Sequence, residues 1–380
     1  EGDAVIAEMM YVGETPWHGF GQKLDAPATA EQAIAAAHLD WDVALEPVWA
    51  QDLTGTQFRP EDPYRFVRRQ DNRAILGMRT LRYSVVQNRD SFGLFDAVIG
   101  PGEGVYHTAG ALRGGKIVWI LAKVRDRRQI VSGDEVEPYI LLSTSHDGSL
   151  PLQMRPTLVR TVCWNTLNYA LSRKDFNDVV TIRHTGNVAN KAVEARKALG
   201  LAGVYFDRMM EGIDQLTKKP MSETGMRNFA LSLYTPNGDE SAHRYTVETL
   251  DKLNQLFVAG RGQQLPGVRG TAWAAYNAVT EFVDYFERVG HGELGQTTHE
   301  RLAKSWFGKR RDRKIRAWLR LQSFANSEKR LCAAMVRRAG FSVDDQSIHV
   351  AIADIESGRP TTSEWGEYLT NLVERLTVAK

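Results

Sequence analysis

Basic and aromatic side chains between residues 65 and 160 have the types and spacing best suited to binding a ligand. Lysine and arginine neutralise phosphates and aromatic rings stack on bases, so together they are typical of single-strand binding. The residues expected to contact phosphates are Arg65, Arg68, Arg82, Arg113, Lys116 and Arg160. The rings expected to stack on bases are Tyr83, Tyr106 and Trp119. The same rings also suit a hydrophobic core, and charge runs also suit a solvated face.

Charge is sorted along the chain, although the net charge is only +2. Residues 1–62 hold twelve acidic and two basic side chains, whereas residues 64–197 hold twenty-one basic and twelve acidic ones. Residues 301–320 hold nine basic side chains and one acidic one. Patches of one sign attract polyanions, so both basic regions are candidates for contact with a nucleic acid.

The second basic region has the spacing of a helix around residues 309–320. Its candidate binding residues are Arg310, Arg313, Lys314 and Arg316. A basic helix can contact phosphates, lie on a membrane surface or pair with acidic side chains. The acidic residues 1–62 are one such partner, in the same chain or in another subunit, and the pattern leaves these alternatives open.

Catalytic residues are harder to find. A cysteine nucleophile needs a histidine or a helix N-terminus to lower its pKa, and Cys163 precedes an expected helix start while His146 or His184 could approach it. A cysteine at the end of an apolar strand is more often a small core residue. A Gly-x-Ser-x-Gly elbow is absent from the sequence, and we assign no catalytic residue.

Metal and cofactor motifs are also missing from the sequence. His107, His146 and His184 are scattered, without the short His or Cys spacings of zinc sites. The sequence contains no Walker A loop. We therefore expect no metal, no cofactor and no nucleotide-driven chemistry. Two distant cysteines, no apolar run of about 18 residues and no secretory signal predict a cytoplasmic protein without a membrane span.

The candidate residues need elements to position them. Alternating apolar residues predict strands between residues 64 and 184, with a hairpin turn at Arg113-Gly114-Gly115 and a turn at His146-Asp147-Gly148. Tyr83–Val86 is predicted as one of these strands. Thr29 and Gln32 have the spacing of a helix capping box. After Asn187 the pattern is helical almost throughout.

The predicted architecture is α+β, with a mixed or antiparallel sheet domain that carries a β-hairpin and packed helices, followed by a mostly α-helical domain. We divide the chain into an acidic N-terminal arm (1–62), a basic β-rich core domain (63–220) and a helical C-terminal domain (221–380).

Several segments together resemble the phage/plasmid-like protein family, a domain-of-unknown-function family of prophages and mobile plasmids. These segments are Tyr11–Gly19, Tyr83–Asn88, Thr108–Gly115, Ser145–Gly148, Val159–Leu167, Arg183–Thr185, Gly270–Trp273 and Asn277–Glu281. The resemblance implies a protein of a mobile element and supplies no catalytic residues. The order of a short helix, a hairpin, further strands and a helix is also similar to the Erf and RecT annealing proteins, which form rings or filaments with DNA in a basic outer groove.

The resulting hypothesis is a homo-oligomeric, ring- or filament-forming protein that binds single-stranded DNA and promotes annealing without ATP, in recombination or replication of a mobile element. One alternative is an enzyme that uses Cys163 or the three histidines. Another is a host-interaction or anti-defence protein whose acidic arm mimics DNA.

Overall fold

The computed structural model describes residues 8–13, 21–26, 28–60, 64–99, 105–124, 126–162, 165–167, 180–182, 188–234, 243–287 and 303–326. The chain forms two compact units, Glu1–Trp318 and Leu319–Lys380, and the features below belong to the first. It is an α+β fold, as predicted: sheets occupy the N-terminal half and helices the C-terminal half. The division at residues 62 and 220 stays a prediction.

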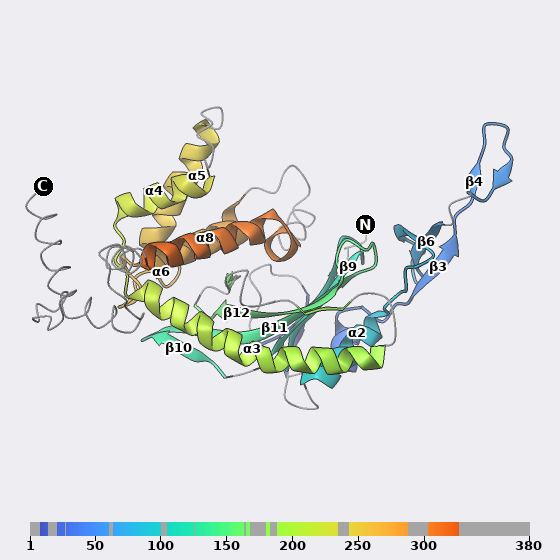
Figure 1. The fold of residues 1–380 in the computed structure, drawn as a ribbon, viewed down its shortest axis with the longest axis horizontal. Coiled ribbons are helices and arrows are strands. Elements are labelled where there is room, and N and C mark those ends of the chain that lie inside the picture. Colours follow the sequence, from blue (N-terminus) through green and yellow to red (C-terminus); the bar gives the residue numbers. More distant parts are fainter. Residues whose placement is uncertain are drawn as a thin grey trace, which may run out of the picture. The chain divides into compact units, whose positions relative to one another are not determined.

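A nine-stranded sheet is the centre of the fold (Figure 1). Its main path runs β13-β12-β11-β9-β8-β1-β2, with β10 paired to β11 and β14 paired to β12. The strands are β1 (Met9–Val12), β2 (Gln22–Leu24), β8 (Val105–Leu112), β9 (Ile117–Lys123), β10 (Arg128–Val131), β11 (Asp134–Ser145), β12 (Leu152–Arg160), β13 (Asn165–Leu167) and β14 (Val180–Ile182). All neighbours are antiparallel except β1 and β2.

The predicted hairpin of β8 and β9 is confirmed. Leu112 pairs with Ile117, and the turn holds Arg113, Gly114 and Gly115 at φ angles of 55°, 67° and 95°. Glycine adopts this left-handed region without the steric penalty of a Cβ atom, which explains the Gly-Gly pair.

Both faces of the sheet are covered. On one face, Tyr106 of β8 packs against Phe92 and Phe95 of α2 (Asn88–Ile99). On the other, Trp119 of β9 packs edge-on against Trp306. Tyr106 pairs with Ala122 and so lies on the same face of the sheet as Ala122. Trp119 is three residues from Ala122 on the same strand, and alternate side chains of a strand point to opposite faces, so Trp119 lies on the other face. Burial from both sides explains why Ile117–Ala122 is a continuous apolar run rather than an alternating one.

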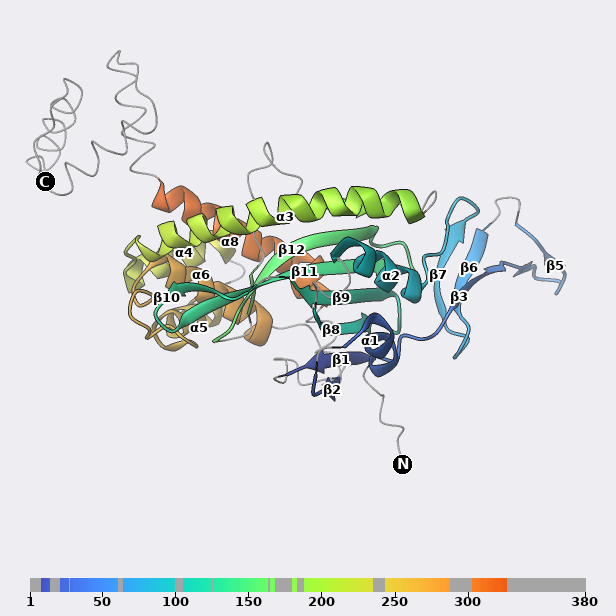
Figure 2. The same cartoon turned by 90° about the horizontal axis from the view of Figure 1, so that it is seen from below.

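Helices α1 (Ala30–Ala36) and α3 (Val188–Thr217) also lie along the sheet (Figure 2). The capping box of α1 is confirmed: Thr29 Oγ1 accepts a hydrogen bond from Gln32 N (3.2 Å), and Gln32 Oε1 accepts one from Thr29 N (3.0 Å). Two reciprocal bonds satisfy backbone donors that a helix start leaves unpaired.

Two small sheets follow α1. The first has the order β3-β6-β7 (Val43–Pro47, Tyr64–Arg69, Ile75–Thr80), and the second pairs β4 (Ala50–Gln51) with β5 (Gln57–Phe58). The strand predicted at Tyr83–Val86 is wrong, because this segment bonds through side chains instead of a backbone ladder. Tyr83 donates to Ser145 O, and the amide of Gln87 pairs with the backbone of Val43.

The helical half comprises α4 (Glu223–Tyr234), α5 (His243–Ala259), α6 (Ala272–Glu281), a π-helix (Phe282–Phe286) and α8 (Lys309–Ala325). Every residue of α6 is buried. Within the described ranges, no helix combines the length and apolarity that a membrane crossing requires. The helical pattern predicted beyond residue 326 lies outside those ranges.

Candidate nucleic-acid interface

Three chain segments meet at one end of the nine-stranded sheet, and we call them the turn cluster: residues 79–83, 113–116 and 146–149. Tyr83 Oη donates to Ser145 O (3.2 Å), and His146 N donates to Lys116 O (2.8 Å). A Cβ atom at Gly148 would lie 2.5 Å from Arg79 Nε, so this arginine lies directly on the β11–β12 turn. The cluster therefore joins segments that are far apart in the sequence.

Backbone geometry explains why these turns have their residues. Gly148 has φ = 66°, and Asp147 Oδ1 accepts a hydrogen bond from Ser149 N (2.8 Å), which closes the turn. Arg113 adopts φ = 55° without being glycine, a conformation that costs roughly 1 kcal/mol or more. A strained arginine at an exposed turn is consistent with a functional role for this site.

Below the turns is a buried polar scaffold. Arg69 is only 3% exposed, forms ion pairs with Glu8 (2.7 Å) and Asp71 (2.6 Å), and lies over the ring of Trp41 at 4.0 Å. His146 Nε2 lies 3.0 Å from Asn88 Oδ1. Because the Asn88 amide nitrogen donates to Leu39 O, its oxygen is an acceptor and His146 carries the proton on Nε2. These bonds hold the turns in place.

The surface of the turn cluster is cationic. Arg82 and Arg113 are exposed, and Arg79 and Lys116 are partly exposed. No carboxylate of the described residues forms an ion pair with Arg79, Arg82 or Lys116. Of the predicted residues, the structure thus brings together Arg82, Tyr83, Arg113 and Lys116. Arg79 lies with them, although it was not predicted as a contact residue. Its place in the series of arginines that begins at Arg65 could have identified it.

Arg65 and Arg68 lie on the small sheet, pointing to opposite faces. Arg65 is paired with Arg79 in the strand register, so the two arginines share a face. Arg68 is on the other face, where its Nε lies 2.7 Å from Glu46. Arg65 therefore extends the cationic surface, whereas the charge of Arg68 is neutralised.

Three predicted contact residues are core residues, and the expectation that they meet a ligand is corrected. Arg160 and Trp119 are fully buried, and Tyr106 is 4% exposed with its hydroxyl bonded to Asp96. The prediction failed because it treated one face of each strand as open to solvent. Helices and the segment 303–307 cover both faces.

The basic helix is likewise mostly neutralised. Lys314 is buried and its Nζ lies 2.5 Å from Asp284 Oδ1, while Arg310 and Arg313 both pair with Glu287. Pairing with acidic side chains was one of the three alternatives, but the partners follow α6 and are not residues 1–62. Of the four predicted residues only Arg316 is exposed.

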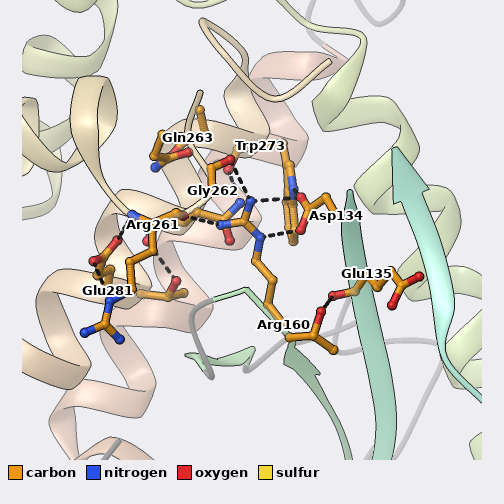
Figure 3. Close-up of polar contacts among 12 residues, drawn as sticks. Asp134, Glu135, Arg160, Arg261, Gly262, Gln263, Trp273 and Glu281 are labelled. Carbon is orange, nitrogen blue, oxygen red and sulfur yellow. Dashed lines mark hydrogen bonds and ion pairs between the residues drawn. The ribbon is translucent and has the colours of Figure 1, made fainter. Parts of the chain in front are cut away.

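Arg160 belongs to a buried network (Figure 3). Its guanidinium donates from Nε and Nη2 to the two oxygens of Asp134 (2.7 and 2.9 Å). Nη1 donates to the carbonyl of Arg261 (3.0 Å), and Nη2 also donates to that of Gly262 (3.2 Å). Trp273 Nε1 also donates to Asp134 (2.9 Å). The network joins β11 and β12 to α6 and to the loop before α6. Its role is therefore structural.

A second polar cluster surrounds Glu137 on β11. Its carboxylate accepts from Lys123 Nζ (2.8 Å), Arg127 Nε (2.6 Å) and Tyr139 Oη (2.6 Å). Burial alone raises the pKa of Glu137, but these three hydrogen bonds outweigh burial and lower the pKa to about 2.

The low pKa of Glu137 predicts a stability loss in acid. A carboxyl with a depressed folded-state pKa stabilises the fold above its unfolded pKa of 4.5, and this contribution disappears as the pH falls toward about 2. Urea unfolding at a series of pH values should show this loss, and Glu137→Gln should flatten the profile over that interval. A variant with the same pH dependence as the wild type would contradict the assignment.

Within the described ranges, the histidines do not form a metal site. His146 is buried in the scaffold, and His107 packs against Tyr139 with ring centroids 5.2 Å apart. Burial lowers the pKa of His107. Cys163 and His184 lie outside the described ranges. Among the residues with described positions, no group of three His, Cys, Asp or Glu side chains could hold a metal ion.

Comparison with known proteins places this fold in a family. Residues 75–316, which contain the turn cluster and the buried network of Arg160, match the domain of unknown function DUF932, and the chain belongs to that family. This confirms the resemblance to phage- and plasmid-type proteins. A similar protein is the UPF0380 protein YafZ of Escherichia coli (strain K12), 27% identical over 175 residues. The match spans 46% of this chain and 58% of YafZ. No solved structure matches the chain.

Proposed function

We propose that the protein binds single-stranded DNA through the turn cluster and promotes annealing without ATP, as a cytoplasmic homo-oligomer acting in recombination or replication of a mobile element. The observation that carries this proposal is the group of Arg79, Arg82 and Lys116 at one sheet end without ion-pair partners among the described residues. Cations that lack protein partners remain available to phosphates.

The rigidity of the cluster adds support. Tyr83 is held by its hydroxyl bond to Ser145 O, which leaves its half-exposed ring in a defined position for stacking. Ring stacking on bases does not depend on sequence. The arrangement therefore favours a binder that tolerates any single strand.

Salt dependence tests this proposal. Each phosphate contact contributes about −0.7 to the slope of log affinity against log salt for single strands. We expect the Arg82→Gln/Lys116→Gln variant to weaken binding of an oligonucleotide and to reduce the slope by about 1.4 in magnitude. Fluorescence anisotropy at several salt concentrations measures both quantities.

Arg227→Gln is the matched control, since Arg227 is an exposed arginine of α4 paired with Asp251. It should leave the slope unchanged. An unaltered slope in the double variant would remove the turn cluster from the interface. Annealing of complementary strands without ATP, compared for the same variants, separates annealing from binding alone.

A further inference from the structure

Exposed apolar side chains are concentrated on the two small sheets. Seven of the fourteen large hydrophobic residues found exposed in the described ranges lie between residues 49 and 81. We call them the apolar arm: Trp49, Leu53, Phe58, Tyr64, Ile75, Met78 and Leu81. Figure 2 shows the β4–β5 hairpin beyond β3 and β6, on the side away from the nine-stranded sheet. Apolar surface of this density marks an interaction site.

The strand register shows which face of the three-stranded sheet is open. Met78 pairs with Phe66, Tyr64 with Thr80 and Ile75 with Arg68, so Tyr64, Ile75 and Met78 share one face. The opposite face is turned toward the nine-stranded sheet at Gly77, where a Cβ atom would lie 3.0 Å from Asp147 Cα. The apolar face is therefore the outer one.

The hairpin is built to hold its tip in place. Asp52 Oδ1 accepts hydrogen bonds from Thr54 N (2.9 Å), Thr54 Oγ1 (2.6 Å) and Thr56 N (2.9 Å). Gln51 Nε2 donates to Gly55 O (3.0 Å). A hairpin with two-residue strands is marginal without such bonds. They present Leu53, which is fully exposed, at a fixed position.

Charge on this face favours a protein partner over a nucleic acid. Arg68 and Arg73 both pair with Glu46, at 2.7 and 3.2 Å, so the face has no set of available cations. At the hairpin, Asp52 and Arg59 carry opposite charges, and neither forms an ion pair within the described ranges. A twofold axis that places Asp52 of one copy opposite Arg59 of the other would pair the two charges twice, because each contact in such an interface occurs in both directions.

The area also fits self-association. With about 200 Å² for a large side chain, the exposed fractions of the seven residues sum to on the order of 800 Å². A stable interface buries about 800 Å² per partner. We propose that the apolar arm docks against the apolar arm of a second copy of this chain. This inference goes beyond the proposed DNA binding and does not depend on it.

Sedimentation velocity of the full chain over a concentration series tests the proposal. The wild type should show a concentration-dependent monomer–dimer equilibrium, and Trp49→Ser/Leu53→Ser should weaken it by about tenfold or more. The control is Val204→Ser/Val247→Ser, which removes two exposed apolar side chains from α3 and α5. It should dimerise as the wild type does. Circular dichroism of all variants confirms that they are folded.

Asp52→Asn tests the charge pairing separately, because asparagine retains the turn-forming oxygen and loses the charge. It should weaken the dimer at low salt and change little at high salt. A monomeric wild type, or equal weakening by the control pair, would overturn the proposal. So would association that appears only with nucleic acid and disappears after nuclease treatment. DNA affinity of the monomeric variant, measured in parallel, keeps this test separate from that of the turn cluster.

Discussion

Arg160→Met is expected to lower the free energy of unfolding by about 3–5 kcal/mol. The substitution leaves Asp134 charged and fully buried, with only Trp273 still donating to its carboxylate. It also leaves the carbonyls of Arg261 and Gly262 without their donor. Removing one partner of a buried ion pair is costly because the other cannot return to water. Urea denaturation of the purified variant measures the change.

The double variant Arg160→Met/Asp134→Leu is the informative control. Replacing both charges by apolar side chains removes the uncompensated charge, so it should be more stable than Arg160→Met alone. The two singles and the double form a thermodynamic cycle for the pair. If Arg160→Met instead had normal stability and weakened DNA binding, Arg160 would have to be placed in the interface.

Trp119→Ala is expected to lower the free energy of unfolding by about 3–5 kcal/mol as well, through loss of a large core side chain. Trp119 is fully buried, and its ring meets that of Trp306 edge-on with centroids 4.5 Å apart. Trp119→Phe should cost less, because the indole N–H has no hydrogen-bond partner among the described residues. Thermal and urea unfolding rank the two variants.

Val258→Ala is the surface control, since Val258 on α5 is 40% exposed and belongs to neither the turn cluster nor the apolar arm. Substitutions away from packed features change stability by about 0.5 kcal/mol or less. DNA binding per folded molecule should be unchanged in Trp119→Phe. Loss of binding in a fully folded Trp119→Phe protein would show that this ring does reach the ligand.

The burial of Arg160 and Trp119 shows why the predicted interface differs from the cationic surface seen in the structure. Arg160 and Arg82 look alike in the sequence, and each is followed by residues typical of a turn or strand end. In the structure, Arg160 faces Asp134 beneath the loop before α6, whereas Arg82 is exposed at the turn cluster. The difference comes from covering elements more than a hundred residues away, as the bonds to Arg261 and Gly262 show.

The sequence by itself determined the local features. The capping box at Thr29, the Gly114-Gly115 hairpin and the change from strands to helices near residue 188 all follow from backbone preferences of nearby residues. Family membership also followed from motifs. Such features need only short-range sterics and hydrogen bonding.

Only the tertiary structure decided which cations remain available. Strand alternation defines two faces but cannot tell that both are covered, so Trp119 and Tyr106 became core residues. Likewise, a run of basic residues does not reveal that Lys314 forms an ion pair with Asp284 and that Arg313 forms one with Glu287. Burial and ion pairing depend on contacts between distant segments, which a local sequence pattern does not specify.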